Sequence, residues 1–514
     1  MPAAASAFAQ LHQHLHTTRL LGSISSALYY DQNTVMPAAG AAWRGEQLAL
    51  LAGQLHGRQS SAEYGELVAA AEDELTPDAP PERRRNLQLL RLELERQRCL
   101  DPDLVAALAK AQSRGNAVWQ DARARNDFSA FAPALQELIN LRRQQASQLA
   151  AAEPVARSPW EILAQPFEPD VSKARLDELF APLKTELPVL LEQVAASGSA
   201  QPAAADLPEA LQEQLCSDLL DSWGYDPQRC QRSRSAHPFS CTVGPQDFRI
   251  TTRVVPGQPL SAFLATAHEW GHSLYEQGLP RTDDHYFPWP LGEATSMGVH
   301  ESQSLFWECR VARSRAFAER WHPSCRDGLG AQPGADPWGD AFNFWRALNP
   351  LKPGLIRVEA DELSYCLHIV LRYELELALL EQEMPVEDLP EQWNRRMQEL
   401  LGIQPTTDSE GCLQDIHWAE GLFGYFPSYA LGHLISAQLA EAIESDLGGP
   451  GSIERAIGAG EEVQLRSWLA QRVWPLGRTV NGEALVAQVS GLPLSAEPFL
   501  HHLRGKLEGL QAAA

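Results

Sequence analysis

Residues 268–272 read His-Glu-Trp-Gly-His, which places two histidines four positions apart with a glutamate directly after the first. In a helix, residues four apart lie on one face, so His268 and His272 would point to the same side. Neutral imidazoles are good ligands for Zn²⁺, and Glu269 beside them could accept a proton from a metal-activated water. The spacing therefore predicts half of a zinc site with hydrolytic chemistry.

The segment around these residues is typical of a helix. Ser261 is a residue type that caps helices, while Gly278 and Pro280 favour a stop, so both histidines would lie in mid-helix. Leu264 and Leu274 would bury much of the same element. We therefore expect the imidazoles to be held in a dry interior.

A catalytic zinc needs a third protein ligand and keeps one position open for water. Residues 290–318 form a second helical pattern shortly after His272, and they offer two candidates, Glu293 and Glu301. Either carboxylate could equally lie exposed on a helix surface. Residue types and spacing alone leave this choice open.

Further motifs flank the HEWGH and HESQS segments, and their order resembles the metallocarboxypeptidase family typified by carboxypeptidase Taq. The resemblance runs from about residue 5 to the end of the chain. The matching segments are Asp31–Gly40, 237–239 (HPF), 247–251 (DFRIT), 356–361 (IRVEAD) and 411–418 (GCLQDIHW).

The resemblance implies roles for residues of this site. Glu301 would be the third metal ligand and Glu269 the general base, with one Zn²⁺ per chain and Co²⁺ as a substitute that the same ligands could hold. Peptides with a free carboxyl terminus would lose single amino acids, and the chain would form a homodimer. These statements rest on the family and not on spacing.

Arg357 lies near the start of a helical pattern over residues 355–384, where the helix dipole does not favour a cation. Its planar fork matches a carboxylate, so the partner could be Asp361 one turn on or the carboxylate of a bound peptide. The family resemblance favours the peptide carboxylate.

Residues 414–432 concentrate hydrogen-bond donors and aromatic rings, which suits stabilisation of an oxyanion. By analogy with related helical oligopeptidases, we expect His417 and Tyr429 to be catalytic, with Tyr425 as the fallback. A histidine or tyrosine satisfied within the core is the competing interpretation. The remaining substrate-binding candidates from the motifs are His237, Arg249, Gln414 and Tyr425.

Helical periodicity dominates the chain and predicts an all-α fold, with two helical halves around a deep substrate groove. Expected helices are 7–30, 40–72, 83–98, 102–126, 130–150, 172–196 and 207–220. Alternation at 237–255 predicts a small β-hairpin before the metal helix, either a wall of the substrate channel or a structural sheet. Without a low-complexity linker or an internal repeat, residues 1–514 are expected to form a single metallocarboxypeptidase domain.

The formal charge of −24 argues against nucleic-acid binding, which needs a basic surface. Because the chain lacks an apolar run of membrane-spanning length, we expect no membrane association. Eight scattered cysteines without a CxxC pair suit a reducing, cytoplasmic setting.

Three alternative functions remain open at this point. An endo-acting zinc oligopeptidase of related helical fold would not need Arg357 to hold a free terminus. A non-catalytic peptide-binding scaffold would have no use for Glu269 beside a metal. A zinc enzyme with a non-peptide substrate would need a pocket whose size the sequence does not reveal.

Overall fold

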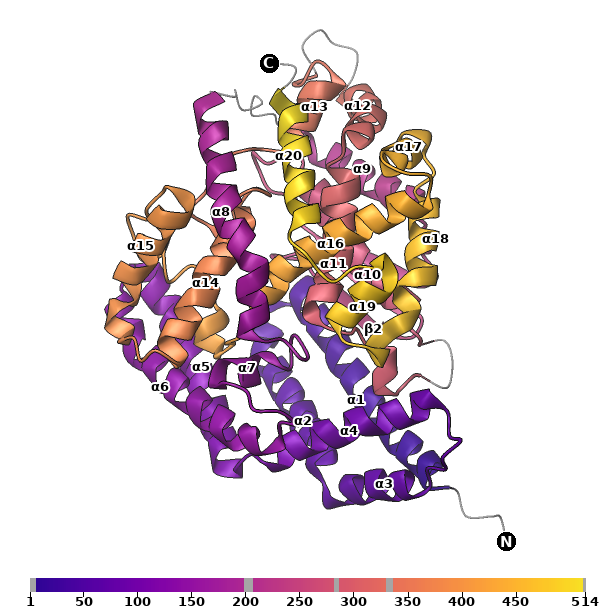
Figure 1. Ribbon diagram of the computed structural model, residues 1–514, viewed down its shortest axis with the longest axis vertical. Coiled ribbons are helices and arrows are strands. Elements are labelled where there is room, and N and C mark those ends of the chain that lie inside the picture. Colours follow the sequence, from indigo (N-terminus) through magenta and orange to yellow (C-terminus); the bar gives the residue numbers. More distant parts are fainter. Residues whose placement is uncertain (1–5, 198–206, 282–285, 330–335, 512–514) are drawn as a thin grey trace.

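The computed structural model describes residues 6–197, 207–281, 286–329 and 336–511, which are mainly helical (Figure 1). This confirms the predicted fold class. The helices of the amino-terminal part are α1 (Ala7–Thr34), α2 (Ala41–Ser60), α3 (Ala62–Asp73), α4 (Pro81–Arg98), α5 (Pro102–Arg125), α6 (Phe128–Leu149), α7 (Pro159–Ala164), α8 (Lys173–Ser197) and α9 (Glu209–Ser222).

The second part begins with the helix that carries the HExxH residues. Its helices are α10 (Ser261–Gly278), α11 (Met297–Leu305), α12 (Arg315–Leu329), α13 (Ala341–Leu348), α14 (Tyr365–Leu380), α15 (Leu389–Leu401), α16 (Pro427–Asp446), α17 (Ser452–Ala459), α18 (Val463–Arg472), α19 (Gly482–Ser490) and α20 (Glu497–Gln511).

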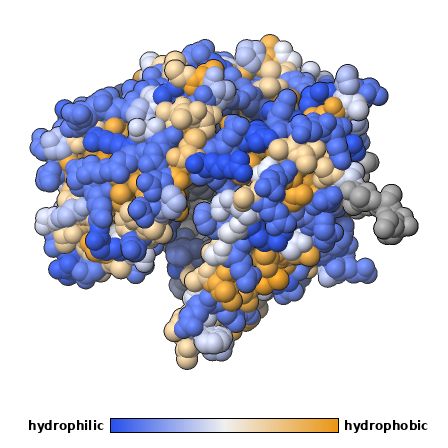
Figure 2. Space-filling model, turned by 90° about the horizontal axis from the view of Figure 1, so that it is seen from below, coloured by the Kyte–Doolittle hydropathy of each residue, from blue (hydrophilic) through white to orange (hydrophobic). Residues whose placement is uncertain are grey.

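The helices form two sides of the molecule above a layer made by α1–α4 (Figure 1). One side contains α5, α6, α14 and α15, and the other contains α10–α12 and α16–α20. Seen from below, the surface is hollowed between two parts of the molecule, and apolar side chains gather on the part that projects beside the hollow (Figure 2). Among the described residues, no helix combines the length and apolar character that crossing a bilayer requires.

Buried apolar side chains form two clusters. The larger one joins residues from Trp119 to Leu510, so it connects both sides of the molecule. The smaller one packs α1, α3 and α4 around Leu11, Val68 and Leu90, together with Trp289. The elements that carry the site therefore belong to one continuous core, while α1, α3 and α4 add a core of their own.

A three-stranded sheet lies against α10. Strands β2 (Ser240–Gly244) and β3 (Asp247–Thr252) pair antiparallel, as the alternation at 237–255 predicts. A further strand, β1 (Cys230–Arg234), pairs parallel to β3 and was not predicted. Thr252 at the end of β3 donates from Oγ1 to the Ala262 carbonyl at 3.1 Å, which fixes the first turn of α10.

Two helix boundaries differ from the prediction. The segment 40–72 is divided into α2 and α3 at Ser61, whose hydroxyl caps α3 by accepting from Tyr64 N. Ser261 does not cap α10: it is the first helical residue, and its hydroxyl donates to the Gln258 carbonyl at 2.9 Å. The stop at Gly278 is as predicted.

Candidate metal centre

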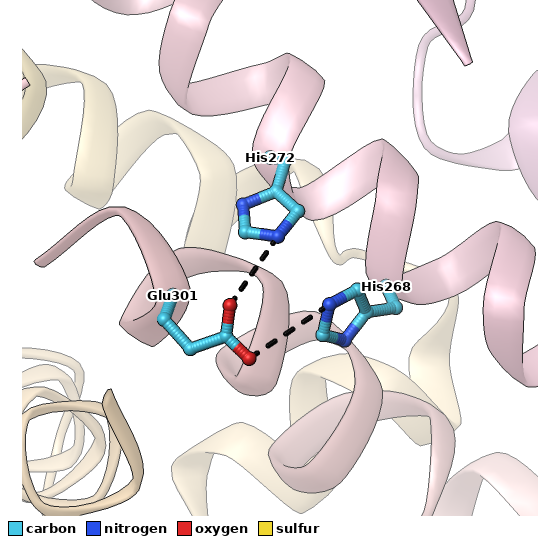
Figure 3. A group of neighbouring side chains, drawn as sticks. All are labelled: His268, His272 and Glu301. Atoms are coloured by element: carbon cyan, nitrogen blue, oxygen red, sulfur yellow. Dashed lines mark ion pairs between the residues drawn. The ribbon is translucent and has the colours of Figure 1, made fainter. Parts of the chain in front are cut away.

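Three side chains from two helices point toward one another (Figure 3). His268 and His272 come from successive turns of α10, and Glu301 comes from α11. Glu301 Oε1 lies 3.9 Å from His268 Nε2, and Glu301 Oε2 lies 3.5 Å from His272 Nε2. One ligand atom from each residue falls within 4.8 Å of the other two, which is the spacing of a site that could hold a metal ion.

Glycine lets the helices approach this closely. A Cβ on Gly271 of α10 would lie 2.7 Å from Ser304 Cα of α11, which backbone atoms cannot accommodate. A Cβ on Gly432 of α16 would meet Glu301 Cγ at 2.7 Å. Helix α11 therefore packs closely against both α10 and α16, and the Glu301 side chain is held against α16.

The other nitrogen of each imidazole has a partner within the chain. His268 Nδ1 lies 2.9 Å from Glu308 Oε2, and His272 Nδ1 lies 3.2 Å from the His300 carbonyl. When Nδ1 donates to these oxygens, the lone pair of Nε2 is left facing Glu301, as a metal ligand requires. Such partners fix the tautomer and the orientation of both rings.

Glu308 belongs to a π-helical segment (Phe306–Ala312) that continues α11. Its second oxygen accepts from Arg313 Nη2 at 2.8 Å, so the carboxylate is held between an arginine and His268. Sequence reasoning did not identify this residue. Its position seven residues after Glu301, two helical turns along the same face, was the signal that could have found it.

The centre contains more negative charge than its histidines can balance. Burial lowers the pKa of His268, but the hydrogen bond to Glu308 and the charge of Glu301 raise it to about 10. Burial and the carboxylate of Glu301 raise the pKa of Glu269 to about 7, although His268 opposes this. A site that would otherwise capture a proton suits a dication, and the residues present therefore fit zinc.

Glu293, the competing candidate for third ligand, lies in a different cluster. Its carboxylate accepts from Arg478 Nη1 at 2.7 Å and forms an ion pair with Arg19. This cluster connects α1 to the turn at residues 290–292. Glu293 therefore takes part in packing between distant segments, and the structure brings Glu301 to the histidines.

Arg357 is not in a long α-helix, contrary to the predicted helix over 355–384. It begins a single 3₁₀-helical turn (Arg357–Glu359), and α14 begins only at Tyr365. The reason is Asp361, whose Oδ1 accepts from Ser364 N at 2.7 Å and so forms a turn just before α14. The alternative of an internal pair between Arg357 and Asp361 is not realised, because the guanidinium contacts Asp415 instead.

The partner of Arg357 is Asp415, from the GCLQDIHW segment. Arg357 Nε and Nη2 donate to Asp415 Oδ1 at 3.0 and 2.9 Å, and Nη1 donates to the Tyr365 hydroxyl at 3.0 Å. Arg372, which is fully buried, donates from Nε to the other oxygen of Asp415 at 2.7 Å. Two guanidinium groups thus share one carboxylate, which leaves this pocket with a net positive charge.

Gln414 holds this pocket together. Its Oε1 accepts from Arg357 N and from Arg372 Nη2, both at 2.8 Å, and its Nε2 donates to the carbonyls of Leu355 and Glu410. The amide is therefore occupied within the chain. These hydrogen bonds hold Arg357 and Arg372 in position, and a contact of Gln414 with the substrate stays a prediction.

The aromatic candidates lie beside the same pocket. His417 begins a short turn (His417–Glu420), and its Nε2 lies 3.4 Å from the hydroxyl of Tyr429 in the first turn of α16. The Tyr425 ring lies 5.4 Å from both rings. Burial lowers the pKa of His417 to about 4 and raises the pKa of Tyr429, so a neutral imidazole and a protonated phenol are present at neutral pH.

Two candidates from the sheet region are placed differently. His237 is exposed between β1 and β2. Arg249 on β3 is paired with Asp247, its Nη2 lying 2.6 Å from Oδ2, and its guanidinium lies 5.0 Å above the Tyr30 ring. The structure gives neither residue a contact with the three metal-ligand candidates, so their substrate role remains a prediction.

Glu308→Gln should lower zinc affinity by about 10- to 100-fold, because the carboxylate that orients His268 loses its charge. The fold should be retained, since glutamine has nearly the same size. Competition for zinc against a chelator of known affinity measures the change. Glu293→Gln is the matched control and should bind zinc as the wild type does; equal affinity in all three proteins would contradict the role of Glu308.

Comparison with known proteins agrees with this geometry. The family model for carboxypeptidase Taq (M32) metallopeptidase matches residues 10–507. Thermostable carboxypeptidase 1 of Thermus thermophilus is 37% identical over 98% of this chain and 99% of the relative. Carboxypeptidase 1 of Bacillus subtilis is 34% identical over 94% of each chain.

Solved structures give the same result. The M32 carboxypeptidase of Deinococcus radiodurans R1 superposes with a TM-score of 0.92 at 32% identity, covering 99% of this chain and 100% of that one. Metallocarboxypeptidase 1 of Trypanosoma cruzi gives 0.91 at 32% identity, covering 98% and 99%. The chain therefore belongs to the carboxypeptidase Taq (M32) family of metallopeptidases.

Proposed function

We propose that this metallocarboxypeptidase releases single amino acids from peptides with a free carboxyl terminus, using one Zn²⁺ held by His268, His272 and Glu301. The observation that carries the proposal is that two buried groups of opposite charge lie near each other. The acidic group around His268, His272 and Glu301 fits a dication. The cationic group at Arg357, whose positive charge opposes the rise that burial causes in the pKa of Glu301, fits a peptide carboxylate.

When bound, the zinc would polarise the scissile carbonyl and make a water molecule more acidic. Glu269 is placed to take a proton from water and to pass it to the leaving amine. Its side chain is only 8% exposed, so bulk water would not compete with this transfer. A pKa raised toward 7 by burial favours both halves of the transfer, although a bound dication would lower it.

Tyr429 and His417 would donate hydrogen bonds to the carbonyl oxygen as it becomes negative. His417 Nε2 and the Tyr429 hydroxyl lie 3.4 Å apart, which places both groups close to one point. Besides burial, the negative charge of Glu301 contributes to raising the pKa of both Tyr425 and Tyr429, which supports a position of these two tyrosines close to the metal ligands. Tyr425 is the alternative donor.

Arg357 would bind the terminal carboxylate of the peptide. Three of the five N–H groups of its guanidinium donate to Asp415 and Tyr365. The other two donate to none of the described residues and could bind a ligand. Asp415 and Tyr365 hold the guanidinium in place. A carboxylate would also balance the net charge of the Arg357–Asp415–Arg372 group.

Several finer properties complete the proposal. The match over residues 10–507 and the large common core support one metallocarboxypeptidase domain over 1–514. Co²⁺ could replace Zn²⁺ because the same imidazole and carboxylate ligands accept it.

Eight free cysteines support a cytoplasmic location. Exposed Leu20, Trp43 and Leu50 on α1 and α2 support a homodimer, which a solution mass of one chain, 56.7 kDa, would contradict.

Glu269→Gln should keep about one zinc per chain and lose on the order of 10³-fold in kcat, because the proton acceptor is removed while the metal ligands stay. Glu301→Ala should lose zinc. Metal analysis and peptide hydrolysis, measured on the same samples, separate the two effects. Glu293→Ala is the control and should retain both zinc and activity. Zinc loss in Glu293→Ala with normal zinc in Glu301→Ala would show that the third ligand is misassigned.

Arg357→Ala should lower kcat/KM by about 10²-fold or more for a ten-residue peptide with a free carboxyl terminus. The amide of the same peptide lacks the negative charge, so it should be a poor substrate for the wild type and little affected by the mutation. Mass spectrometry should show residues leaving one at a time from the carboxyl end. All hydrolysis should stop with a chelator.

Arg372→Met is the control for this experiment, because Arg372 shares Asp415 with Arg357 but is fully buried. It should lose stability and weaken the preference for the free acid less than Arg357→Ala does, because it removes net charge from the group but none of the donors that would bind the peptide. Should Arg357→Ala reduce hydrolysis of the acid and the amide by the same factor, Arg357 acts only within the fold. Internal cleavage of the amidated peptide would favour an endo-acting oligopeptidase.

A further inference from the structure

A second charged group is buried behind the metal centre. Arg310 follows Glu308 by two residues, Glu362 precedes α14, and Lys506 belongs to α20. Glu362 Oε1 lies 3.3 Å from Arg310 Nη1, and Glu362 Oε2 accepts from Lys506 Nζ at 2.6 Å. The three side chains are 3%, 10% and 9% exposed. One carboxylate thus serves two cations away from solvent.

The charges of this region do not balance. Arg310, Arg313 and Lys506 are cations, while Glu308 and Glu362 are the carboxylates that contact them, which leaves one positive charge. The neighbouring histidines do not change this sum, because burial lowers the pKa of His433 to about 4 and that of His502 to about 3. Glu454 interacts electrostatically with Lys506 but is not counted in this sum, because it is exposed. Its carboxylate accepts from Ala316 N at 2.7 Å.

Arg310 has more donors than the one carboxylate oxygen beside it, Glu362 Oε1, can accept, and this oxygen also lacks a hydrogen-bond partner among the described residues. Arg310 Nε and Nη2 are buried without a hydrogen-bond partner among the described residues, and Nη1 is not aligned for a hydrogen bond to Glu362. His433 Nδ1 is likewise buried without a partner in the described part of the chain. A buried guanidinium with unsatisfied donors is costly, so negative charge in its surroundings would stabilise the folded state.

Space for a small ion adjoins Glu362 and Lys506, and Arg310 is not part of its lining. A cavity of about 20 Å³ is lined by Arg313, Glu362 and Lys506, together with Asn349 and leucines from α20. This volume suits one water molecule or one small ion. Two of its three charged lining residues are cations.

A metal ion is the competing occupant. Cys309, Glu362 and His433 place ligand atoms within 4.8 Å of one another, a set that could hold zinc. However, Arg310 and Lys506 already contact Glu362, so a dication would add to an uncompensated positive charge. Burial and nearby carboxylates also raise the pKa of the Cys309 thiol well above its usual value, which disfavours the thiolate.

We propose that this cavity binds one small monovalent anion of the size of chloride, held by Lys506 and Arg313 and balanced against Arg310. Arg313 also donates to Glu308, the carboxylate that contacts His268. The anion would therefore stabilise the packing directly behind the metal centre. Binding of the anion would not depend on which peptide the enzyme cleaves.

The test uses the zinc-loaded full chain in sodium gluconate, replaced stepwise by sodium chloride or sodium bromide at constant ionic strength. Gluconate is too large for the cavity. Chloride and bromide should raise Tm by about 2 °C or more in a saturable manner, because a ligand that binds only the folded state stabilises it. A crystal soaked in bromide should show an anomalous peak beside Lys506.

Lys506→Met removes the uncompensated charge and should abolish the halide response, while Lys506→Arg keeps the charge and should retain it. Lys110→Met, at an exposed position, is the control for a general effect of charge removal and should respond as the wild type does. The proposal is overturned if wild-type Tm is the same in chloride and gluconate, or if bromide is absent from the cavity. Two zinc ions per chain, the second at Cys309, would overturn it as well.

Discussion

The site depends on how closely α10, α11 and α16 approach one another. Glycine at 271 and 432 removes the Cβ atoms that would keep these helices apart, and Ser304 and Glu301 occupy the space. Overpacking such a contact costs about 1–3 kcal/mol, and here the resulting shift would also displace a metal ligand. The close crossing brings Glu301 against a pair of histidines that α10 already presents on one face. Metal binding is thus a consequence of helix packing.

Charge is separated within the interior of a chain whose formal charge is −24. Around His268 and His272 the carboxylates of Glu269, Glu301 and Glu308 are in excess, which suits a cation. Around Asp415 the guanidinium groups are in excess, which suits a carboxylate. A peptide with a free carboxyl terminus would therefore be oriented by both groups together. The electrostatic potential at each group is set by the charges nearest to it, so it can differ in sign from the net charge of the chain.

Most of what could be predicted from the sequence is local. Helical periodicity predicted α1, α4, α5, α6 and α8 with ends that differ from the structure by at most four residues, and the i, i+4 spacing predicted the two histidines. Two of the features that were missed depend on distant residues, and two others are local. Strand β1 pairs parallel to β3 and has no turn signal, and the partner of Arg357 is Asp415, 58 positions away and not Asp361 on a presumed helix. The start of α14 was placed too early because Asp361 forms a turn that periodicity cannot reveal. Glu308 was overlooked although it lies on the same helical face as Glu301.

Anomalous diffraction at the zinc absorption edge, from crystals of the full chain, tests the central claim most directly. We expect one peak at about 2.0–2.2 Å from His268 Nε2, His272 Nε2 and a Glu301 oxygen, with Nδ1 of His268 still bonded to Glu308. A peak that is not in contact with Glu301, or zinc bound through Nδ1 of either histidine, would contradict the assignment of this centre.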